Sequence, residues 1–243
     1  MKTTVTRCSV IVIAVLTVLA LVGSAAVSPA QAFLGNPRVL PPHSHPHGLT
    51  YAEWGTRWWQ WADSIPATDN PILDPTGADC GQGQSGPVWF LAGTAGNSVV
   101  RSCTVPVGKA ILIPILNINN DYPCPDPSFQ PAPGQSLEDF LTEGAAAVID
   151  LVDDLLVEVD GVPLRNLFAY RATSALFTFT GDPSLTPVLD PCLTGTPQAG
   201  VSDGYWVMLA PLSRGEHTVH FRGGITSFGF QVEATYQLTV SGH

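Results

Sequence analysis

The chain has 243 residues, of which ten are basic and twenty are acidic, and its net charge at pH 7 is −10. A chain this acidic repels nucleic-acid phosphates and anionic lipid, which argues against nucleic-acid binding and against a membrane-surface role. Its length suits one domain with a sizeable hydrophobic core.

The first segment, residues 1–32, has the order of a secretory signal. Lys2 and Arg7 precede an unbroken apolar run over 10–22, and small residues follow it. The run is shorter than the roughly 20 residues that span a bilayer, so no stable membrane span is expected after cleavage; an uncleaved anchor is the alternative. Cleavage leaves eight basic and twenty acidic residues, a net charge of −12. We therefore expect a secreted, periplasmic or cell-envelope location.

Residues 33–49 are rich in proline and histidine and read as an extended leader to the domain. His43, His45 and His47 place three imidazoles within five residues, and such a cluster can bind a transition metal such as Cu²⁺, Ni²⁺ or Zn²⁺. The neighbouring prolines favour polyproline geometry, which would scatter the three rings. A solvated leader that happens to be rich in histidine is the simpler interpretation.

A helix is predicted over about 51–63. Thr50 and Glu53 have the spacing of a capping box, and Pro66 follows the helix. From Thr50 onward, residues 50–243 are expected to form a single domain.

This helix carries four tryptophans. Trp54, Trp58 and Trp61 share one face with Tyr51, and a stripe at helical spacing is typically a core contact. Exposed aromatic rings can also bind a sugar or a protein partner. Trp59 lies off the stripe, so it is the best candidate for an exposed ring at such an interface.

The rest of the chain is predicted to be mainly β. A second helix is expected over about 137–151, with Ser136 as its cap. The final segment alternates apolar and polar residues, as in a half-buried antiparallel strand. Short strands separated by turn residues predict an antiparallel β-sandwich, immunoglobulin-like or jelly-roll-like, with one aromatic helix before it and one helix inserted. The expected strands cover 87–93, 98–105, 109–117, a hairpin over 155–164, 175–180, 205–212, 216–223 and 228–240.

Four cysteines follow the signal segment, and an even number in an exported protein favours two disulfides. Of three possible pairings we expect Cys80–Cys103 and Cys124–Cys192. The first would join a loop to the strand that returns past it, and the second would join two proline-flanked loops.

An oxygen-rich segment surrounds Cys124. Side chains of this kind at such density can bind Ca²⁺, although they are also the usual turn formers. The candidate ligands are Asn117, Asn119, Asn120, Asp121 and Asp126.

Nucleotide binding and triad catalysis both lack support in the sequence. Residues 81–86 (GQGQSG) match the dinucleotide pattern G-x-G-x-x-G, but they follow a cysteine loop and precede a strand, so a nucleotide site is not expected. No Ser/His/Asp or Cys/His triad can be assembled from the sequence.

Three segments carry a resemblance: EWGTRWWQW (53–61), GPVWFLAGT (86–94) and CTVPVGKAILIPILN (103–117). They resemble a family of exported bacterial proteins of uncharacterised activity, marked by a Glu-Trp-x-x-Arg-Trp-Trp-Gln-Trp helix. Residues 211–240 resemble the closing strand pair of extracellular immunoglobulin-like sandwiches. The first resemblance implies export, and the second supports the fold class.

The sequence favours an exported, non-enzymatic binding or envelope-associated protein that contacts a protein or a carbohydrate. The alternative is an exported metal-dependent enzyme with histidine ligands on the same sandwich. Stoichiometric transition metal in the purified mature protein would favour the enzyme.

The mature chain is predicted to begin at Phe33, because Ala30 and Ala32 satisfy the small-residue rule before the cut. N-terminal sequencing of the exported protein checks this. A protein that still carries residues 1–32 would contradict it.

Overall fold

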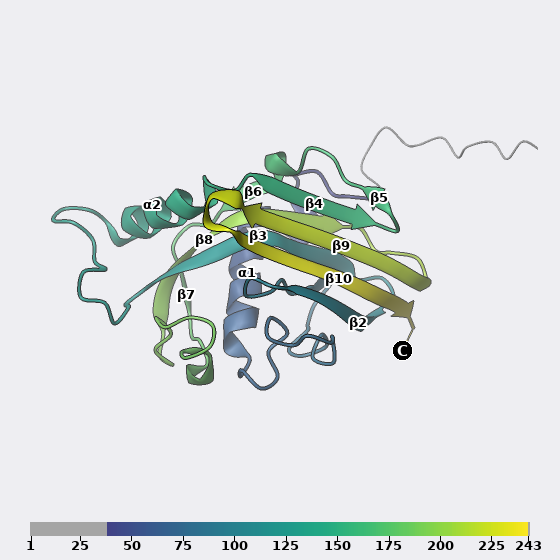
Figure 1. The fold of residues 1–243 in the computed structure, drawn as a ribbon, viewed down its shortest axis with the longest axis horizontal. Helices are drawn as coiled ribbons and strands as arrows, with labels where there is room; N and C mark the ends of the chain where they lie inside the picture. The colour runs from purple at the N-terminus through teal and green to yellow at the C-terminus, as the bar shows by residue number, and fades with distance from the viewer. Residues whose placement is uncertain (1–37, 243) are drawn as a thin grey trace, which may run out of the picture. The chain divides into compact units, whose positions relative to one another are not determined.

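The computed structural model describes residues 38–242, so the predicted signal segment and residues 33–37 of the leader lie outside it. The described chain forms two five-stranded sheets with two α-helices (Figure 1). This confirms the prediction of a mainly β sandwich with one helix before it and one inserted.

The first sheet, sheet A, is built around two long central strands that run antiparallel. Its order is β1-β3-β8-β6. The short strand β7 also pairs with β8, at residues 198–200, whereas β6 pairs at residues 203–205. The strands are β1 (Val88–Phe90), β3 (Ala110–Tyr122), β6 (Arg171–Thr173), β7 (Phe177–Phe179) and β8 (Gln198–Leu209).

The second sheet, sheet B, has the order β2-β10-β9-β4-β5. The predicted hairpin is present, because β4 and β5 are joined by Asp160 and Gly161, both with positive φ, as a tight two-residue turn requires. The strands are β2 (Ser98–Pro106), β4 (Asp154–Val159), β5 (Val162–Pro163), β9 (Gly215–Ile225) and β10 (Phe230–Ser241).

Two of the strand pairings differ from the antiparallel expectation. The β1–β3 and β2–β10 pairs are parallel. A parallel pair needs a long connection that returns the chain to the same end of the sheet, and the connection from β2 to β10 contains every strand of sheet A except β1. Local alternation in sequence does not contain this information.

The two α-helices lie on opposite faces of sheet A (Figure 1). Helix α1 (Tyr51–Ser64) begins with the predicted capping box of Thr50 and Glu53, and α2 (Leu137–Ile149) begins after Ser136. Four short 3-10 turns complete the described chain: η1 (Pro46–Gly48), η2 (Leu167–Tyr170), η3 (Pro183–Leu185) and η4 (Thr226–Phe228). Within residues 38–242, no helix combines the length and hydropathy needed to cross a membrane.

The aromatic stripe of α1 docks the helix on sheet A. Trp54, Trp58 and Trp61 are 4%, 2% and 7% exposed, which places all three in the core. Trp58 packs edge-to-face on Trp206 of β8, with ring centroids 5.6 Å apart. Each indole N–H also donates to a backbone carbonyl at 2.8–2.9 Å: those of Pro46, Leu91 and Gln82.

Trp59 is not the exposed ring that its position off the stripe predicted. It is half-buried and packs edge-to-face against Trp58, with centroids 4.9 Å apart. With Leu189 it lines a small hollow of about 70 Å³. A loop from a distant part of the chain therefore covers the face that an isolated helix would expose.

The second half of the leader belongs to the domain and is not a detached extended segment. Val39 forms a β-bridge with Leu209, and Leu40 is bonded to β8 through a 2.9 Å hydrogen bond from its N–H to the Met208 carbonyl. Pro46 is buried beneath Trp54. These contacts use backbone groups, so the amino-acid composition of residues 33–49 does not indicate that the leader packs on the domain.

Both predicted disulfides are present in the predicted pairing. Cys80–Cys103 joins the glycine-rich loop to β2, and Cys124–Cys192 joins the loop after β3 to the loop before β8. Two disulfides are typical of proteins from an oxidising compartment.

Arg101 of β2 is 1% exposed and lies between sheet B and the long connection 65–93. Its guanidinium forms no ion pair among the described residues; instead it donates five hydrogen bonds of 2.7–3.0 Å. The acceptors are the carbonyls of Ile72, Asp74, Ala92 and Gly93 and the hydroxyl of Tyr236 on β10.

We predict that Arg101→Lys lowers the free energy of unfolding by on the order of 3 kcal/mol, because one ammonium cannot reach all five acceptors and leaves buried carbonyls without donors. Arg222→Lys is the matched control, since Arg222 is a partly exposed partner of Asp154 and should cost about 1 kcal/mol or less. Denaturant melts compare the two. Equal losses of unfolding free energy in the two variants would show that Arg101 does not hold the connection 65–93 in place.

Candidate functional site

Strand β3 continues beyond the segment that the sequence analysis placed in a strand. Residues 117–122 pair with β8, with Asp121 opposite Gly200 and Asn119 opposite Ser202. Because alternate side chains of a strand point to opposite faces, Asn119 and Asp121 share the face that α1 covers. Asn120 lies on the other face, where its amide donates to the Leu141 carbonyl of α2 at 2.8 Å.

Helix α1 brings a second acidic group to this face. Asp63, in its last turn, is 2% exposed, and its Oδ2 accepts a 3.3 Å hydrogen bond from Asn119 Nδ2. The Asn119 amide crosses the sheet close to Gly200, where a Cβ would lie 2.5 Å from Asn119 Oδ1. That oxygen is buried and receives no donor from residues 38–242. Glycine at position 200 therefore makes room for the amide between the carboxylates.

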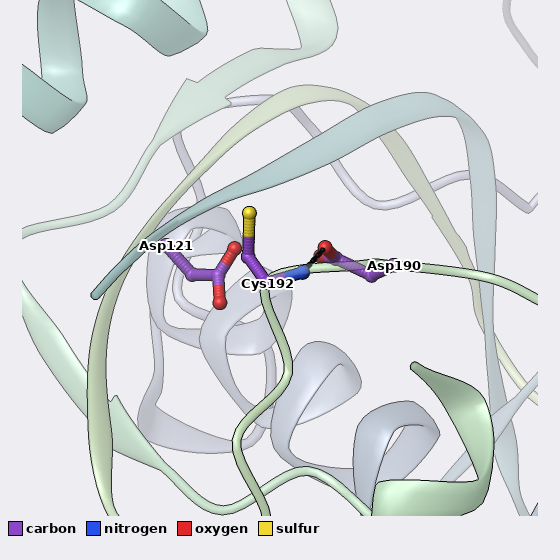
Figure 2. Close-up of side chains that lie close together, drawn as sticks. All are labelled: Asp121, Asp190 and Cys192. Carbon is purple, nitrogen blue, oxygen red and sulfur yellow. Dashed lines mark hydrogen bonds between the residues drawn. The ribbon is translucent and has the colours of Figure 1, made fainter. Parts of the chain in front are cut away.

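The loop before β8 supplies Asp190 and Cys192 opposite Asp121 (Figure 2). A ligand atom from each of the three lies within 4.8 Å of the others. Asp190 Oδ1 accepts a 2.8 Å bond from the Cys192 backbone N–H, and the Gln198 amide donates to Asp121 Oδ2. The Cys192 sulfur is bonded to Cys124, so it is not available as a metal ligand. The carboxylates of Asp121 and Asp190 are therefore the groups of this trio that remain available to a ligand.

Burial governs the protonation of this cluster. Burial raises the pKa of Asp121 to about 8, and both the charge of Asp190 and its hydrogen bond to Asp121 add to the rise. Burial also raises the pKa of Asp63 well above its ordinary value, as does the charge of Asp190, while the bond from Asn119 opposes the shift. No basic side chain contributes to either shift. Asp63 and Asp121 carry no charge when protonated, and a divalent cation could replace their protons.

The structure revises the predicted calcium ligands. Asp121 is retained, but Asp126 lies in an exposed turn, where its Oδ1 accepts from the backbone and hydroxyl of Ser128 at 2.8 and 2.7 Å. Asn117 lines the small hollow beside Trp59. Residues 117–122 extend β3 and do not form a loop, so strand alternation sends these side chains to opposite faces. Asp63 and Asp190, distant in sequence, take their place.

The three leader histidines do not form a ligand group with other histidines, cysteines or carboxylates in the described chain. His43 and His45 are exposed, and His47 lies edge-on to Trp54, with ring centroids 6.5 Å apart. A turn from Pro41 to Ser44 and the 3-10 turn η1 break the alternation that an extended chain would have given.

A second candidate site is a hollow of about 340 Å³ beside α1. Edges of three aromatic rings line it, those of Trp54, Trp61 and Phe90, together with the polar side chains of Arg57, Gln60 and Ser85. We call it the α1 groove. The Arg57 guanidinium lies over the Trp54 ring, 5.5 Å from its centroid. The groove therefore combines apolar ring edges with hydrogen-bonding groups.

The far wall of the α1 groove is the glycine-rich loop 80–87, which is held firmly. The Gln84 amide bonds the backbone of Phe90 in both directions, at 2.8 and 2.9 Å, and Trp61 Nε1 donates to the Gln82 carbonyl. Gly83 has a φ of +60°, and a Cβ there would lie 3.1 Å from the Trp61 ring. The glycines thus allow a tight loop to pack on α1. The match of this segment to a nucleotide motif does not indicate that role.

No protein-family model, curated protein or solved structure matches this chain. The two sites must therefore be interpreted from their own geometry.

We predict that the free energy of unfolding falls as pH rises from about 4 to about 8. In this window the folded state retains the Asp121 proton, while the unfolded state, with the ordinary pKa of 3.8, has lost it. Asp121→Asn keeps the shape of the side chain but removes its titrating group. It should therefore reduce the slope of the unfolding free energy against pH. Denaturant melts across this range, with and without millimolar Ca²⁺, measure it.

Asp126→Asn is the matched control, because Ser128 lowers the pKa of this exposed carboxyl, which should leave the slope between pH 4 and 8 unchanged. If Ca²⁺ flattens the pH dependence of the unfolding free energy in wild type but not in Asp121→Asn, a cation binds at Asp121 and Asp190. An unchanged slope in Asp121→Asn would refute the assignment.

Proposed function

We propose that this protein is an exported, non-enzymatic binding protein that holds a carbohydrate in the α1 groove. The observation that carries the proposal is the composition of the groove: three aromatic ring edges and three hydrogen-bonding side chains around about 340 Å³. This volume lies within the usual range for small-molecule sites, roughly 300–1,000 Å³.

The groove matches the two kinds of surface that a sugar presents. The edges of Trp54, Trp61 and Phe90 offer apolar contact for C–H groups. Arg57 and Ser85 offer donors and acceptors for hydroxyls. Because the loop 80–87 is fixed by a disulfide and by side-chain bonds, little conformational entropy would be lost on binding.

Export is supported by the sequence of residues 1–32 and by the two disulfides. The segments that carry the resemblance to exported bacterial proteins also meet at this site. Residues 53–61 and 86–94 supply most of the groove, and 103–117 supplies the strand beside β1. A protein partner is the second class of ligand for the same surface.

An enzyme would need reacting groups where the ligand lies. The α1 groove is lined by no histidine and no carboxylate. His43 lines a separate hollow of about 250 Å³ with Arg171, and the pair Asp121–Asp190 lines neither of these hollows. The groove geometry therefore supports binding in preference to the metal-dependent enzyme.

We predict that Arg57→Ala weakens oligosaccharide binding by about tenfold, since it removes a guanidinium that stands over Trp54 in the groove. Arg57 is exposed, so the free energy of unfolding should change by about 1 kcal/mol or less. Titration of purified protein with soluble neutral and acidic oligosaccharides, followed by tryptophan fluorescence and calorimetry, measures both affinity and specificity.

Arg165→Ala is the control, because Arg165 is exposed and lines none of these hollows. Equal affinity in wild type and Arg57→Ala would remove the groove from the proposal. Recovery of cleaved oligosaccharide would support the enzyme instead.

A further inference from the structure

We infer that the carbohydrate is anionic and that it extends from the α1 groove over the glycine-rich loop into a second hollow, where Lys109 binds its negative group. The inference rests on the proposed function and specifies the class of ligand. It is carried by the second hollow and by the distribution of charge around the loop.

The second hollow has a volume of about 290 Å³ and lies on the other side of loop 80–87. We call it the Lys109 hollow. Its polar lining comes from Ser85, Thr104 and Ser241 as well as Lys109, and Trp89 supplies an apolar wall. Lys109 donates to the Gly86 carbonyl, which anchors its ammonium at the loop. An ammonium has three N–H donors, so two remain for a ligand.

Ser85 lines both the α1 groove and the Lys109 hollow, and other residues of the same glycine-rich loop line each of them. Each hollow taken alone has about the smallest volume usual for a ligand site. A ligand of two or more sugar units that crosses the loop at Ser85 would occupy both. A single small anion would occupy only the Lys109 hollow.

The charge around the loop is opposite to that of the chain. Acidic residues outnumber basic ones twenty to ten in the sequence, yet no carboxylate lines either hollow, and each hollow contains one basic side chain. Arg57 and Lys109 form no salt bridge within residues 38–242, whereas Arg171 and Arg222 are paired with aspartates. Glu53 is a charged neighbour of Arg57, whereas Lys109 forms no salt bridge within the described residues, so the Lys109 hollow is the part of the site that favours an anionic sugar.

The negative group can be a carboxylate, as in a uronic acid, or a sulfate ester. Both present oxygen acceptors to an ammonium, and a charge-assisted hydrogen bond of this kind is stronger than a neutral one. The two sources share the same recognition chemistry, so the experiment includes both.

The test compares oligogalacturonate with its methyl ester, which has the same sugar units without the charge, and with a sulfated oligosaccharide. Calorimetry measures the affinity of each for wild type, Lys109→Gln and Lys109→Arg. Lys109→Gln removes the charge and keeps a polar side chain with N–H donors. The loop should keep its conformation, because the Gln84 amide and the Cys80–Cys103 disulfide also hold it. Arg165→Gln removes one positive charge elsewhere and is the matched control.

The expected result is that wild type binds an anionic oligomer about tenfold or more tightly than the ester, that Lys109→Gln loses this preference, and that Lys109→Arg and Arg165→Gln keep it. Preference for the sulfated oligomer alone would identify the negative group as sulfate. Equal binding of acid and ester, or an acid preference that survives in Lys109→Gln, would overturn the inference and leave a neutral sugar in the groove. Failure of every oligosaccharide to bind would refute the proposed function together with this inference.

Discussion

The buried guanidinium of Arg101 holds the connection that supplies one wall of the α1 groove. Its five hydrogen bonds end on carbonyls of the connection between α1 and β2 and on Tyr236 of β10. That connection contains the glycine-rich loop and lies between α1 and sheet B. A charge this deeply buried is tolerated only where its donors are satisfied, so the connection is fixed in one conformation. The Cys80–Cys103 disulfide adds a covalent link to the same strand.

Helix α1 takes part in both sites because its sides carry different residues. One side packs Trp58 on Trp206 and sets the position of the helix on sheet A. The last turn then carries Asp63 to the carboxylates of β3, while Arg57 and Trp61 meet the glycine-rich loop. A change in how α1 packs would therefore alter the acidic cluster and the α1 groove together.

The two sites contain groups of opposite charge: the buried cluster is acidic, whereas the hollows beside the glycine-rich loop are lined by basic side chains. Burial and the charge of Asp190 raise the pKa values of Asp63 and Asp121, so their ionisation is disfavoured in the folded protein. Arg57 and Lys109 each line a hollow beside the glycine-rich loop, and no carboxylate lines either hollow. The buried cluster thus bears on stability and its pH dependence, whereas the loop has the access and the charge that recognition of a ligand requires.

The sequence by itself determined the features that depend on local chemistry. The capping box at Thr50, the Asp160-Gly161 hairpin and the core role of Trp58 follow from spacing, because each involves residues close in the chain. The loops and the strand that surround the cysteines also led to the correct disulfide pairing. Alternation was enough for a mainly β sandwich.

Only the tertiary structure decided which distant residues meet. The parallel β2–β10 pair, the loop that covers Trp59 and the approach of Asp190 to Asp121 all join segments far apart in sequence. The oxygen-rich segment around Cys124 was dispersed for the same reason: pairing with β8 extended β3 through residues 117–122 and sent alternate side chains to opposite faces. Such contacts depend on long-range pairing of strands and connections, and no local pattern of residue types specifies that pairing.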